Sequence, residues 1–485
     1  MAYEVVIGLE VHAQLLTASK MFCGCGTAFG AAPNTQTCPV CLGLPGVLPV
    51  INRKAVEFAV RTGLALHCTI APMNRFARKH YFYPDLPKNY QISQYELPIC
   101  EHGWLEIGQN GTSKRIRIRR AHLEEDAGKN LHAGIAGASH VDLNRAGTPL
   151  LEIVTEPDMR SPDEAVAYLK TLRDILVYLG VCDGNMEEGS LRCEPNLSLR
   201  PAGSKELGTK VELKNINSFK FVKAAMEYEI KRQTKVLDEG GKVAQETRLW
   251  DTEKGETAVM RSKEEAHDYR YFPDPDLVPL RITTEMVEEA RKTLPKLPDA
   301  MRKSLVNEFG LTEQTAAVLT ANPDVVKYFA EVSAIATGGV LHVVGETSKT
   351  EVNRDIANWI TVDLPGMEKD FLARIPASEI AELVTLKRKG EISGPIVKTV
   401  LEERLKTGQS VSEIIKAKGL TQVSDEGALE KIIDDVMAKD LQQLAQYKGG
   451  KVEVFGFFVG QVMKASGGKA NPAKVNELLK RKLAQ

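Results

Sequence analysis

Residues 5–15, VVIGLEVHAQL, alternate between apolar and polar side chains, and this stretch decides the fold of the first part of the chain. The apolar positions are Leu9, Val11, Ala13 and Leu15, and the polar positions between them are Glu10, His12 and Gln14. A period of two residues is typical of a β-strand with one buried face. Residues 115–119 alternate Arg and Ile in the same way. We therefore expect short strands separated by Gly, Pro and Asn over residues 1 to about 160.

Two helices are predicted beyond these strands. Ser161-Pro162-Asp163-Glu164 has the form of a capping box with proline at the first helical position, and it predicts a helix over 161–180. A second helix is expected over 218–239, because Gly240 and Gly241 follow it. Strands and helices do not alternate regularly along the chain. The sequence therefore predicts an α+β fold rather than a doubly wound sheet.

The length of 485 residues corresponds to about three domains. Five prolines interrupt the pattern between 272 and 298, and segments beyond them, such as 380–388 and 396–405, have helical periodicity. A turn at Thr407-Gly408 then opens a smaller unit. We expect a mixed strand and helix domain over 1–293, an all-α helical domain over 294–406 and a small, mostly helical tail over 407–485.

The charges of the chain balance, with 63 Lys and Arg against 64 Asp and Glu, which excludes a strongly basic protein. The N-terminus lacks the features of a secretory signal, and no apolar run is long enough to span a membrane, so we expect a cytoplasmic protein without a membrane partner. Residues 448–485 are locally basic, with eight Lys or Arg against two Glu. This segment also holds Phe455, Phe457 and Phe458. It is either a solvated helix end with core phenylalanines or a contact for an RNA backbone.

Four of the eight cysteines are closely spaced as Cys23-Gly24-Cys25 and, twelve residues later, Cys38-Pro39-Val40-Cys41. Two thiolate pairs, each set by a tight turn, can close a tetrahedral Zn²⁺ site with no open position, which is typical of a structural metal. The alternatives are four free thiols or a redox pair at Cys38 and Cys41. The remaining cysteines lack this spacing and are expected to be buried as small apolar residues: Cys68, Cys100, Cys182 and Cys193.

Carboxylates and histidine on the predicted strands form a second candidate site. Glu10 and His12 point to the same face of their strand at about 6.5–7 Å separation, close enough to share a cation or a substrate. The run HLEEDAGK at 122–129, with Glu124 and Glu125, follows the arginine-rich strand. It is either a solvated turn or, beside arginines, suited to Mg²⁺ and phosphate. Glu152 lies in an apolar run, where burial demands an Arg or Lys partner or a shared metal.

Two polar segments could contact a ligand. Residues 78–94, RKHYFYPDLPKNYQISQ, combine aromatic, amide and cationic side chains, which fits a loop that binds a nucleotide or an RNA end, or else a rigid surface turn. Lys210, Glu212, Lys214, Asn215 and Asn217 precede the helix expected at 218, whose N-terminus attracts anions. The sequence contains no Walker A, Rossmann, HExxH or GxSxG motif, so these residues alone do not indicate the use of ATP.

Six stretches closely resemble the GatB family, one of the subunit families of the tRNA-dependent amidotransferases. They are VIGLEVHAQL at 6–15, RKHYFYPDLPKNYQISQ at 78–94, HLEEDAGK at 122–129, LNRAGTPLLEIV at 143–154, EEGSLRCE at 187–194 and DYRYFPDPD at 268–276. The tail, with GKANP at 468–472, is similar to that family as well, so the resemblance spans nearly the whole chain. It implies a cradle-shaped catalytic domain, a helical domain and a tail that binds tRNA.

The resemblance also implies partners and a reaction. The partners are an amidase subunit (GatA-like) that releases ammonia from glutamine, a small third subunit (GatC-like), and mischarged tRNA. The reaction converts Glu-tRNA(Gln) or Asp-tRNA(Asn) to the amide form. Because a carboxylate is a poor electrophile, ATP must first convert it to an acyl phosphate, with Mg²⁺ and cationic side chains spreading the charge of the transferring phosphoryl group.

The resemblance places the metal site on His12, Glu125 and Glu152, with Glu10 and Glu124 beside it as further catalytic residues. Histidine is an unusual ligand for Mg²⁺, so Mn²⁺ is an alternative. Lys79 and Lys214 are candidates for neutralising phosphate, with Asn215 beside Lys214, and the cysteine quartet resembles the zinc knuckle of part of the family. Two other functions stay open: a synthetase or other carboxylate ligase, although the HIGH and KMSKS motifs are absent, and a zinc-bearing scaffold that only presents tRNA.

Overall fold

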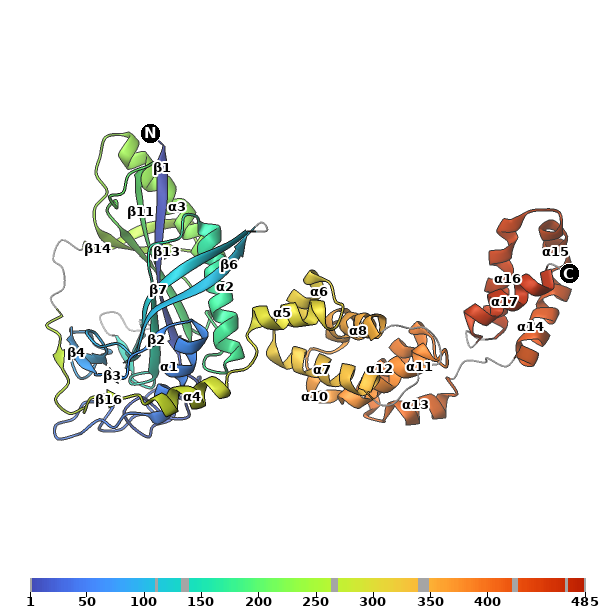
Figure 1. Ribbon diagram of the computed structural model, residues 1–485, viewed down its shortest axis with the longest axis horizontal. Helices are drawn as coiled ribbons and strands as arrows, with labels where there is room; N and C mark the ends of the chain where they lie inside the picture. The colour runs from blue at the N-terminus through green and yellow to red at the C-terminus, as the bar shows by residue number, and fades with distance from the viewer. Residues whose placement is uncertain are drawn as a thin grey trace. The chain divides into compact units, whose positions relative to one another are not determined.

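The computed structural model describes residues 2–109, 112–131, 139–262, 269–338, 349–420, 426–466 and 470–483. The chain forms two compact units, Met1–Pro298 and Asp299–Gln485 (Figure 1). Strands lie in the first unit and the second is helical, which confirms the α+β prediction. The finer division at 293 and 406 stays a prediction. Among the described residues, no helix combines the length and the apolar character needed to cross a membrane.

A twelve-stranded sheet forms the frame of the first unit. Its main path runs in the order β14-β13-β12-β11-β1-β10-β7-β5-β4-β15, and β6 pairs with both β7 and β2. Neighbours are antiparallel except β12 and β13. The strands are β1 (Tyr3–Gln14), β2 (Thr69–Ile70), β4 (Ala77–His80), β5 (Tyr90–Ser93), β6 (Cys100–Gln109), β7 (Thr112–Glu125), β10 (Pro149–Thr155), β11 (Leu191–Pro201), β12 (Val211–Lys214), β13 (Glu246–Asp251), β14 (Glu256–Ser262) and β15 (Phe272–Pro273). Two small ribbons pair β3 (Met73–Asn74) with β16 (Leu280–Arg281) and β8 (Lys129–Leu131) with β9 (His140–Asp142).

The predicted first strand is confirmed as β1, which lies between β10 and β11 in the sheet. Its apolar residues Leu9, Val11 and Ala13 are fully buried in the core. Because successive side chains of a strand point to opposite faces, Glu10 and His12 point to the other face. One face of the sheet is therefore apolar, and the other is polar around β1.

Helices cover the apolar face and complete the core of the first unit. They are α1 (Arg53–Ala65), α2 (Pro162–Tyr178), α3 (Phe219–Asp238) and α4 (Thr284–Lys292) (Figure 1). Each contributes apolar residues to one hydrophobic cluster. The hydroxyl of Ser161 accepts from the Glu164 N–H, as predicted for the start of α2. In the predicted capping box the Glu164 carboxylate would accept from the Ser161 N–H. It accepts instead from the N–H of the preceding residue, Arg160. Ser218 caps α3, as expected.

The end of β7 shows whether the carboxylate run at 122–129 is a solvated turn. The run that follows the arginine-rich segment is not a solvated turn: β7 continues to Glu125, and His122, Glu124, Glu125 and Asp126 are each less than 5% exposed. Pairing with β10 holds this end inside the sheet. Burying so many ionisable groups is costly unless each has a partner. Their partners define the site described below.

The second unit contains two hydrophobic clusters, over residues 305–415 and 429–483. Its helices are α5 (Pro298–Asn307), α6 (Glu313–Leu319), α7 (Pro323–Gly338), α8 (Lys349–Asn358), a π-helical turn (Trp359–Asp363), α9 (Leu364–Met367), α10 (Phe371–Arg374), α11 (Ala377–Arg388), α12 (Gly394–Thr407), α13 (Val411–Lys418), α14 (Glu426–Lys439), α15 (Leu441–Lys448), a 3-10 turn (Val452–Val454), α16 (Phe455–Ala465) and α17 (Pro472–Leu483). Phe458 is fully buried in the last cluster, whereas Phe457 is 36% exposed, so the core alternative holds for Phe458 but not for Phe457. Gly467, Gly468 and Lys469 of the predicted basic segment lie outside the described residues.

Candidate active site and metal centres

Two histidines and two glutamates meet on the polar face of the sheet. His12 on β1 pairs in register with Glu152 on β10, which pairs in turn with His122 on β7. Residues that face each other across neighbouring strands point to the same side, as does Glu124, two residues after His122. His12 Nε2 lies 3.5 Å from Glu152 Oε2 and 3.7 Å from Glu124 Oε1. His122 Nε2 lies 3.4 Å from Glu152 Oε2 and 3.8 Å from Glu124 Oε2.

These four side chains control one another's protonation. Burial acts to lower the pKa of His12, but Glu152 and the nearby Glu194 and Glu124 outweigh it and raise that pKa to about 9. Burial acts to raise the pKa of Glu152, but the His122 and His12 rings hold it well below its usual range. Among the described residues, histidines therefore take the place of the Arg or Lys partner that the sequence offered for the buried Glu152. The shared-metal alternative stays a prediction.

Three of these residues have the geometry of a cation site. One ligand atom each from His12, Glu124 and Glu152 lies within 4.8 Å of the other two. Carboxylate oxygens suit Mg²⁺, and an imidazole nitrogen suits Mn²⁺ better. The residues present therefore fit a divalent cation, with Glu124 in place of the predicted Glu125.

Glu125 lies on the opposite side of the sheet, because it follows Glu124 directly on β7. Its carboxylate pairs with Lys88 and accepts from the Ile92 N–H at 2.9 Å. It lines a cavity of about 200 Å³ together with Cys41 and Lys20. The structure thus divides the predicted His12, Glu125 and Glu152 set between two faces, and Glu125 joins the surroundings of the cysteines.

A second acidic group adjoins the first on the polar face. Glu10, Glu194 and Glu212 bring one carboxylate oxygen each within 4.8 Å of one another. Lys214 partly neutralises them, with its Nζ 2.6 Å from Glu194 and 3.5 Å from Glu212. Burial, followed by the charges of Glu152, Glu194 and Glu212, raises the pKa of Glu10. Glu10 therefore lies among like charges. A cation or a cationic side chain beside it would relieve this repulsion.

Lys79 on β4 interacts electrostatically with the histidine–glutamate cluster. Burial acts to lower its pKa, but Glu124, Tyr271 and Glu152 raise it above the usual lysine value. Its ammonium lies 4.9 Å from the centre of the Tyr269 ring and 5.7 Å from that of Tyr81. Among the described residues no carboxylate lies within 4.0 Å of it. Lys79 is thus a charged side chain held by aromatic rings rather than by an ion pair.

A cavity of about 930 Å³ brings Lys79 and Lys214 to one place. Five strands separate β4 from β12 in the sheet, a span of about 29 Å if the sheet were flat. Because both lysines line the same cavity, the sheet curves around it. The predicted ligand-binding segment 78–94 forms the β4–β5 hairpin, and its Tyr81, Phe82 and Tyr83 also line the cavity.

Arg192 is a functional candidate that the sequence did not single out. It pairs with His12 in register, so it shares the polar face. One guanidinium nitrogen donates to Asp126 Oδ2 at 2.8 Å, and Gln14 donates to the same oxygen at 2.8 Å. The Nε of Arg192 is buried without a hydrogen-bond partner in the described part of the chain. Asp126 therefore anchors the guanidinium on the polar face beside His12.

Asn215 has a structural task instead of the predicted cofactor contact. Its side-chain amide donates to the Trp250 carbonyl at 3.1 Å. Its backbone is left-handed, with φ of 63°, in the turn between β12 and α3. Asn215 is not among the residues that line the large cavity. The structure therefore gives no support to Asn215 as a ligand.

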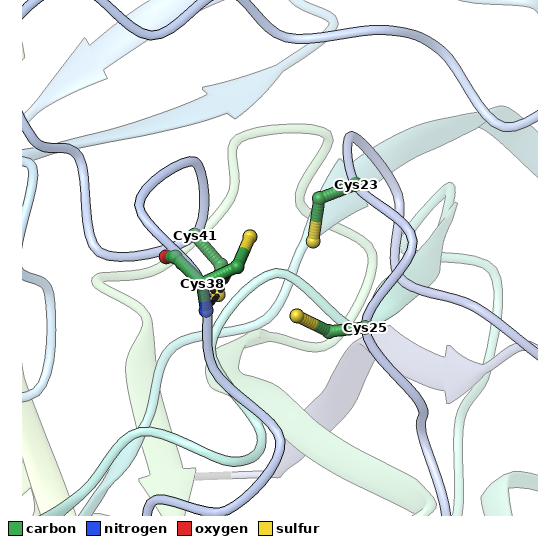
Figure 2. A group of neighbouring side chains, drawn as sticks. All are labelled: Cys23, Cys25, Cys38 and Cys41. Atoms are coloured by element: carbon green, nitrogen blue, oxygen red, sulfur yellow. Dashed lines mark hydrogen bonds between the residues drawn. The ribbon is translucent and has the colours of Figure 1, made fainter.

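The four predicted zinc ligands converge, with their sulfur atoms within 4.8 Å of one another. Figure 2 shows Cys23 and Cys25 on one loop turned toward Cys38 and Cys41 on another. The Cys38 N–H donates to Cys41 Sγ at 3.1 Å, which holds the second pair in one tight turn. Four thiolates from two turns fit Zn²⁺. The other cysteines are buried and form no disulfides, as predicted: Cys68, Cys100, Cys182 and Cys193.

Local sequence patterns assign no individual role to His122, Asp126, Arg192 or Glu194. Strand alternation would have found His122, since His122 and Glu124 share a face once β7 is extended to its end. The position of Glu194 follows from its pairing with Glu10 across β1 and β11. No local pattern in the sequence indicates that pairing, because about 180 residues separate the two strands.

The fold and the site define an α+β enzyme in which the polar face of a curved sheet gathers carboxylates, histidines and cationic side chains. Two of these cationic side chains, Lys79 and Lys214, line one cavity. Known proteins identify the family. The sequence model of the GatB/GatE catalytic domain matches residues 5–288, and that of the GatB domain matches residues 342–483. The chain belongs to this family, the GatB subunits of the tRNA-dependent amidotransferases.

Full-length relatives agree with this assignment. Proteins of Geobacter sp. (strain M21) and Geobacter sulfurreducens are each 57% identical over 491 aligned positions that cover all of both chains. A protein of Thermodesulfovibrio yellowstonii is 55% identical over 99% of both chains. All three are named as the same subunit of an aspartyl/glutamyl-tRNA(Asn/Gln) amidotransferase, which marks each as one part of a larger enzyme.

Proposed function

We propose that this chain is the subunit of an aminoacyl-tRNA amidotransferase that activates and amidates Glu-tRNA(Gln), Asp-tRNA(Asn) or both, as a carbon–nitrogen ligase of translation in the cytoplasm. The observation that carries the proposal is the placement of His12, Glu124 and Glu152 on the sheet face that also presents Lys79 and Arg192. Phosphoryl transfer depends mainly on positioning and on stabilising charge. A cluster that can hold a divalent cation, flanked by cationic side chains, meets both needs.

Each group has a task in the reaction. ATP is the phosphoryl donor, and the side-chain carboxylate of the mischarged tRNA attacks its γ-phosphorus, which releases ADP and forms an acyl phosphate. Mg²⁺ or Mn²⁺ at the Glu124, Glu152 and His12 cluster would neutralise charge on the phosphoryl oxygens. Lys79, Arg192 and Lys214 stabilise the anionic groups around it. Ammonia then displaces phosphate and leaves the amide, so no serine or cysteine nucleophile is required in this subunit.

The large cavity suits the two substrates that must meet. The tyrosines of the β4–β5 hairpin and Tyr269 offer aromatic faces for a base of ATP or of the tRNA acceptor end. Ammonia is supplied by an amidase subunit (GatA-like), and a small subunit (GatC-like) completes the heterotrimer. The cysteine quartet holds a structural Zn²⁺.

The proposal is tested with the chain co-expressed with its amidase and small partners. Glutamine-dependent amide formation on mischarged tRNA should require ATP and should release one ADP for each amide formed. Correctly charged Gln-tRNA(Gln) is the control and should give neither product. Amide formation without ADP would leave this subunit as a scaffold that presents tRNA to the amidase.

Elemental analysis tests the zinc site. We expect close to one zinc atom per chain in protein purified without chelators, because four sulfurs converge with no open position. The variant Cys38→Ser with Cys41→Ser should contain none. Metal-free wild-type protein that remains folded would refute the zinc proposal.

The tail is expected to bind the tRNA backbone. The described cations Lys474, Arg481 and Lys482 pair with acidic residues of α14, whereas Lys448, Lys451, Lys464 and Lys480 have no carboxylate within 4.0 Å among the described residues. Val411, Ile414 and Ile415 of α13 pack in the preceding hydrophobic cluster, so a truncation is best made after residue 420. It should weaken tRNA binding and make its dependence on log salt shallower by about 3 to 4 units. Replacing these last four lysines by glutamine should reproduce the effect, and unchanged affinity in both variants would contradict it.

A further inference from the structure

Lys20 is a buried lysine beside the cysteine quartet. Its side chain is 1% exposed, and its backbone N–H donates to the Cys25 carbonyl at 2.9 Å. A β-bridge between Ser19 and Gly26 closes the loop around it. Lys20 therefore belongs by its backbone to the loop of the first cysteine pair. Its side chain extends to the second pair.

The ammonium of Lys20 contacts a sulfur and a carbonyl rather than a carboxylate. Its Nζ lies 3.6 Å from Cys41 Sγ and 3.3 Å from the Leu143 carbonyl oxygen. No carboxylate oxygen of the described residues lies within 4.0 Å of it. The two carboxylates that line the same cavity, Glu125 and Asp276, are engaged by Lys88 and Arg78.

A buried ammonium without an anion is strongly unfavourable. The carbonyl supplies a dipole but no charge, so the anion available to Lys20 is the sulfur of Cys41. A divalent cation bound by four thiolates has a net charge of −2, which a donating ammonium reduces. Groups that donate hydrogen bonds to metal ligands from outside the ligand set commonly change metal affinity by about 10- to 100-fold.

We propose that Lys20 is the charge-balancing residue of the four-cysteine metal centre: it donates to Cys41 Sγ and thereby raises the affinity of the quartet for its metal. The proposal rests on the zinc site proposed above. Gly147 lies against both groups, since an added Cβ would be 3.5 Å from Cys41 Cβ and from Lys20 Cδ. The Leu143 and Gly147 segment leads directly into β10, which carries Glu152, so Lys20 joins the metal loops to the strand of the active site.

The test compares Lys20→Met with Lys88→Met in the full chain with its partner subunits. Methionine keeps much of the apolar length of lysine and removes the charge. Lys88 lines the same cavity but pairs with Glu125 rather than with sulfur. Zinc dissociation constants are measured by competition with a chelator of known affinity, and Co²⁺-loaded samples report the thiolate-to-cobalt absorption.

Lys20→Met should bind zinc about 10- to 100-fold more weakly than wild type. Lys88→Met should lose stability, because Glu125 is left unpaired, but its folded fraction should keep a zinc affinity within about threefold of wild type. If Lys20→Met does not fold, Lys20→Gln keeps a neutral donor and should show a smaller loss. Wild-type affinity in the folded Lys20 variant, or an equal loss in Lys88→Met, would overturn the role of Lys20. Wild-type protein that binds neither Zn²⁺ nor Co²⁺ would instead overturn the metal site itself.

Discussion

Glu124→Gln is expected to reduce ATP-dependent amide formation by about 100- to 1,000-fold, which is the cost of removing one preorganised charge from a transition state. The change keeps the size of the side chain and its contact with the Ser93 hydroxyl at 3.2 Å. It removes one of the two carboxylates that face His12 and His122, and one of the three ligands of the candidate cation site. The measurement is kcat for amide formation by the complete enzyme at saturating ATP and tRNA.

Two companion measurements separate catalysis from folding and binding. Glu106→Gln alters an exposed glutamate of β6 that pairs with Arg115, and it should keep full activity. The affinity of Glu124→Gln for mischarged tRNA should match that of wild type, because Glu124 is only 3% exposed and so offers no surface to the RNA. Weak tRNA binding with an intact kcat would mean that Glu124 supports the substrate surface and not the chemistry.

Glu125→Gln should instead lower the stability of the fold, by about 3 kcal/mol in the free energy of unfolding. Glu125 and Lys88 are 4% and 10% exposed in their side chains, so their ion pair is buried. Glutamine can still accept from the Ile92 N–H but cannot balance the ammonium of Lys88. For a unit of this size the midpoint of thermal unfolding should fall by about 5 °C. Activity per folded molecule should change far less than in Glu124→Gln.

The double variant Glu125→Gln with Lys88→Met tests the cause. Removing both charges should restore part of the lost stability, since the penalty comes from leaving one buried charge unpaired. A double variant that is less stable than either single variant would show that Lys88 and Glu125 act independently.

The contrast between Glu124 and Glu125 shows which features of the fold and the site could be predicted from the sequence. Alternation over 5–15 predicted β1 and the shared face of Glu10 and His12, and cysteine spacing predicted the quartet. The HLEED run was ambiguous because crowded carboxylates are usually solvated. Without the knowledge that β7 continues to Glu125, alternation could not be applied, and adjacent glutamates were indistinguishable.

Local sequence patterns could not predict which distant strands pair with one another. Glu152 needed a buried partner, and apolar surroundings alone could not reveal that His12 and His122 stand on either side of it. Arg192 faces His12 only because β11 pairs with β1. The role of Lys20 was hidden for the same reason, since a single lysine next to Met21 and Phe22 gives no sign that its ammonium reaches Cys41.

We propose that this subunit phosphorylates the carboxylate of mischarged tRNA at the His12, Glu124 and Glu152 cluster. The most direct measurement is single-turnover ADP formation by the complete enzyme with Glu-tRNA(Gln) and ATP, without glutamine or ammonia. Wild type and Glu125→Gln should each give a burst approaching one ADP per bound tRNA, and Glu124→Gln should give none while binding tRNA normally. A full burst in Glu124→Gln would place phosphoryl transfer elsewhere and contradict the account.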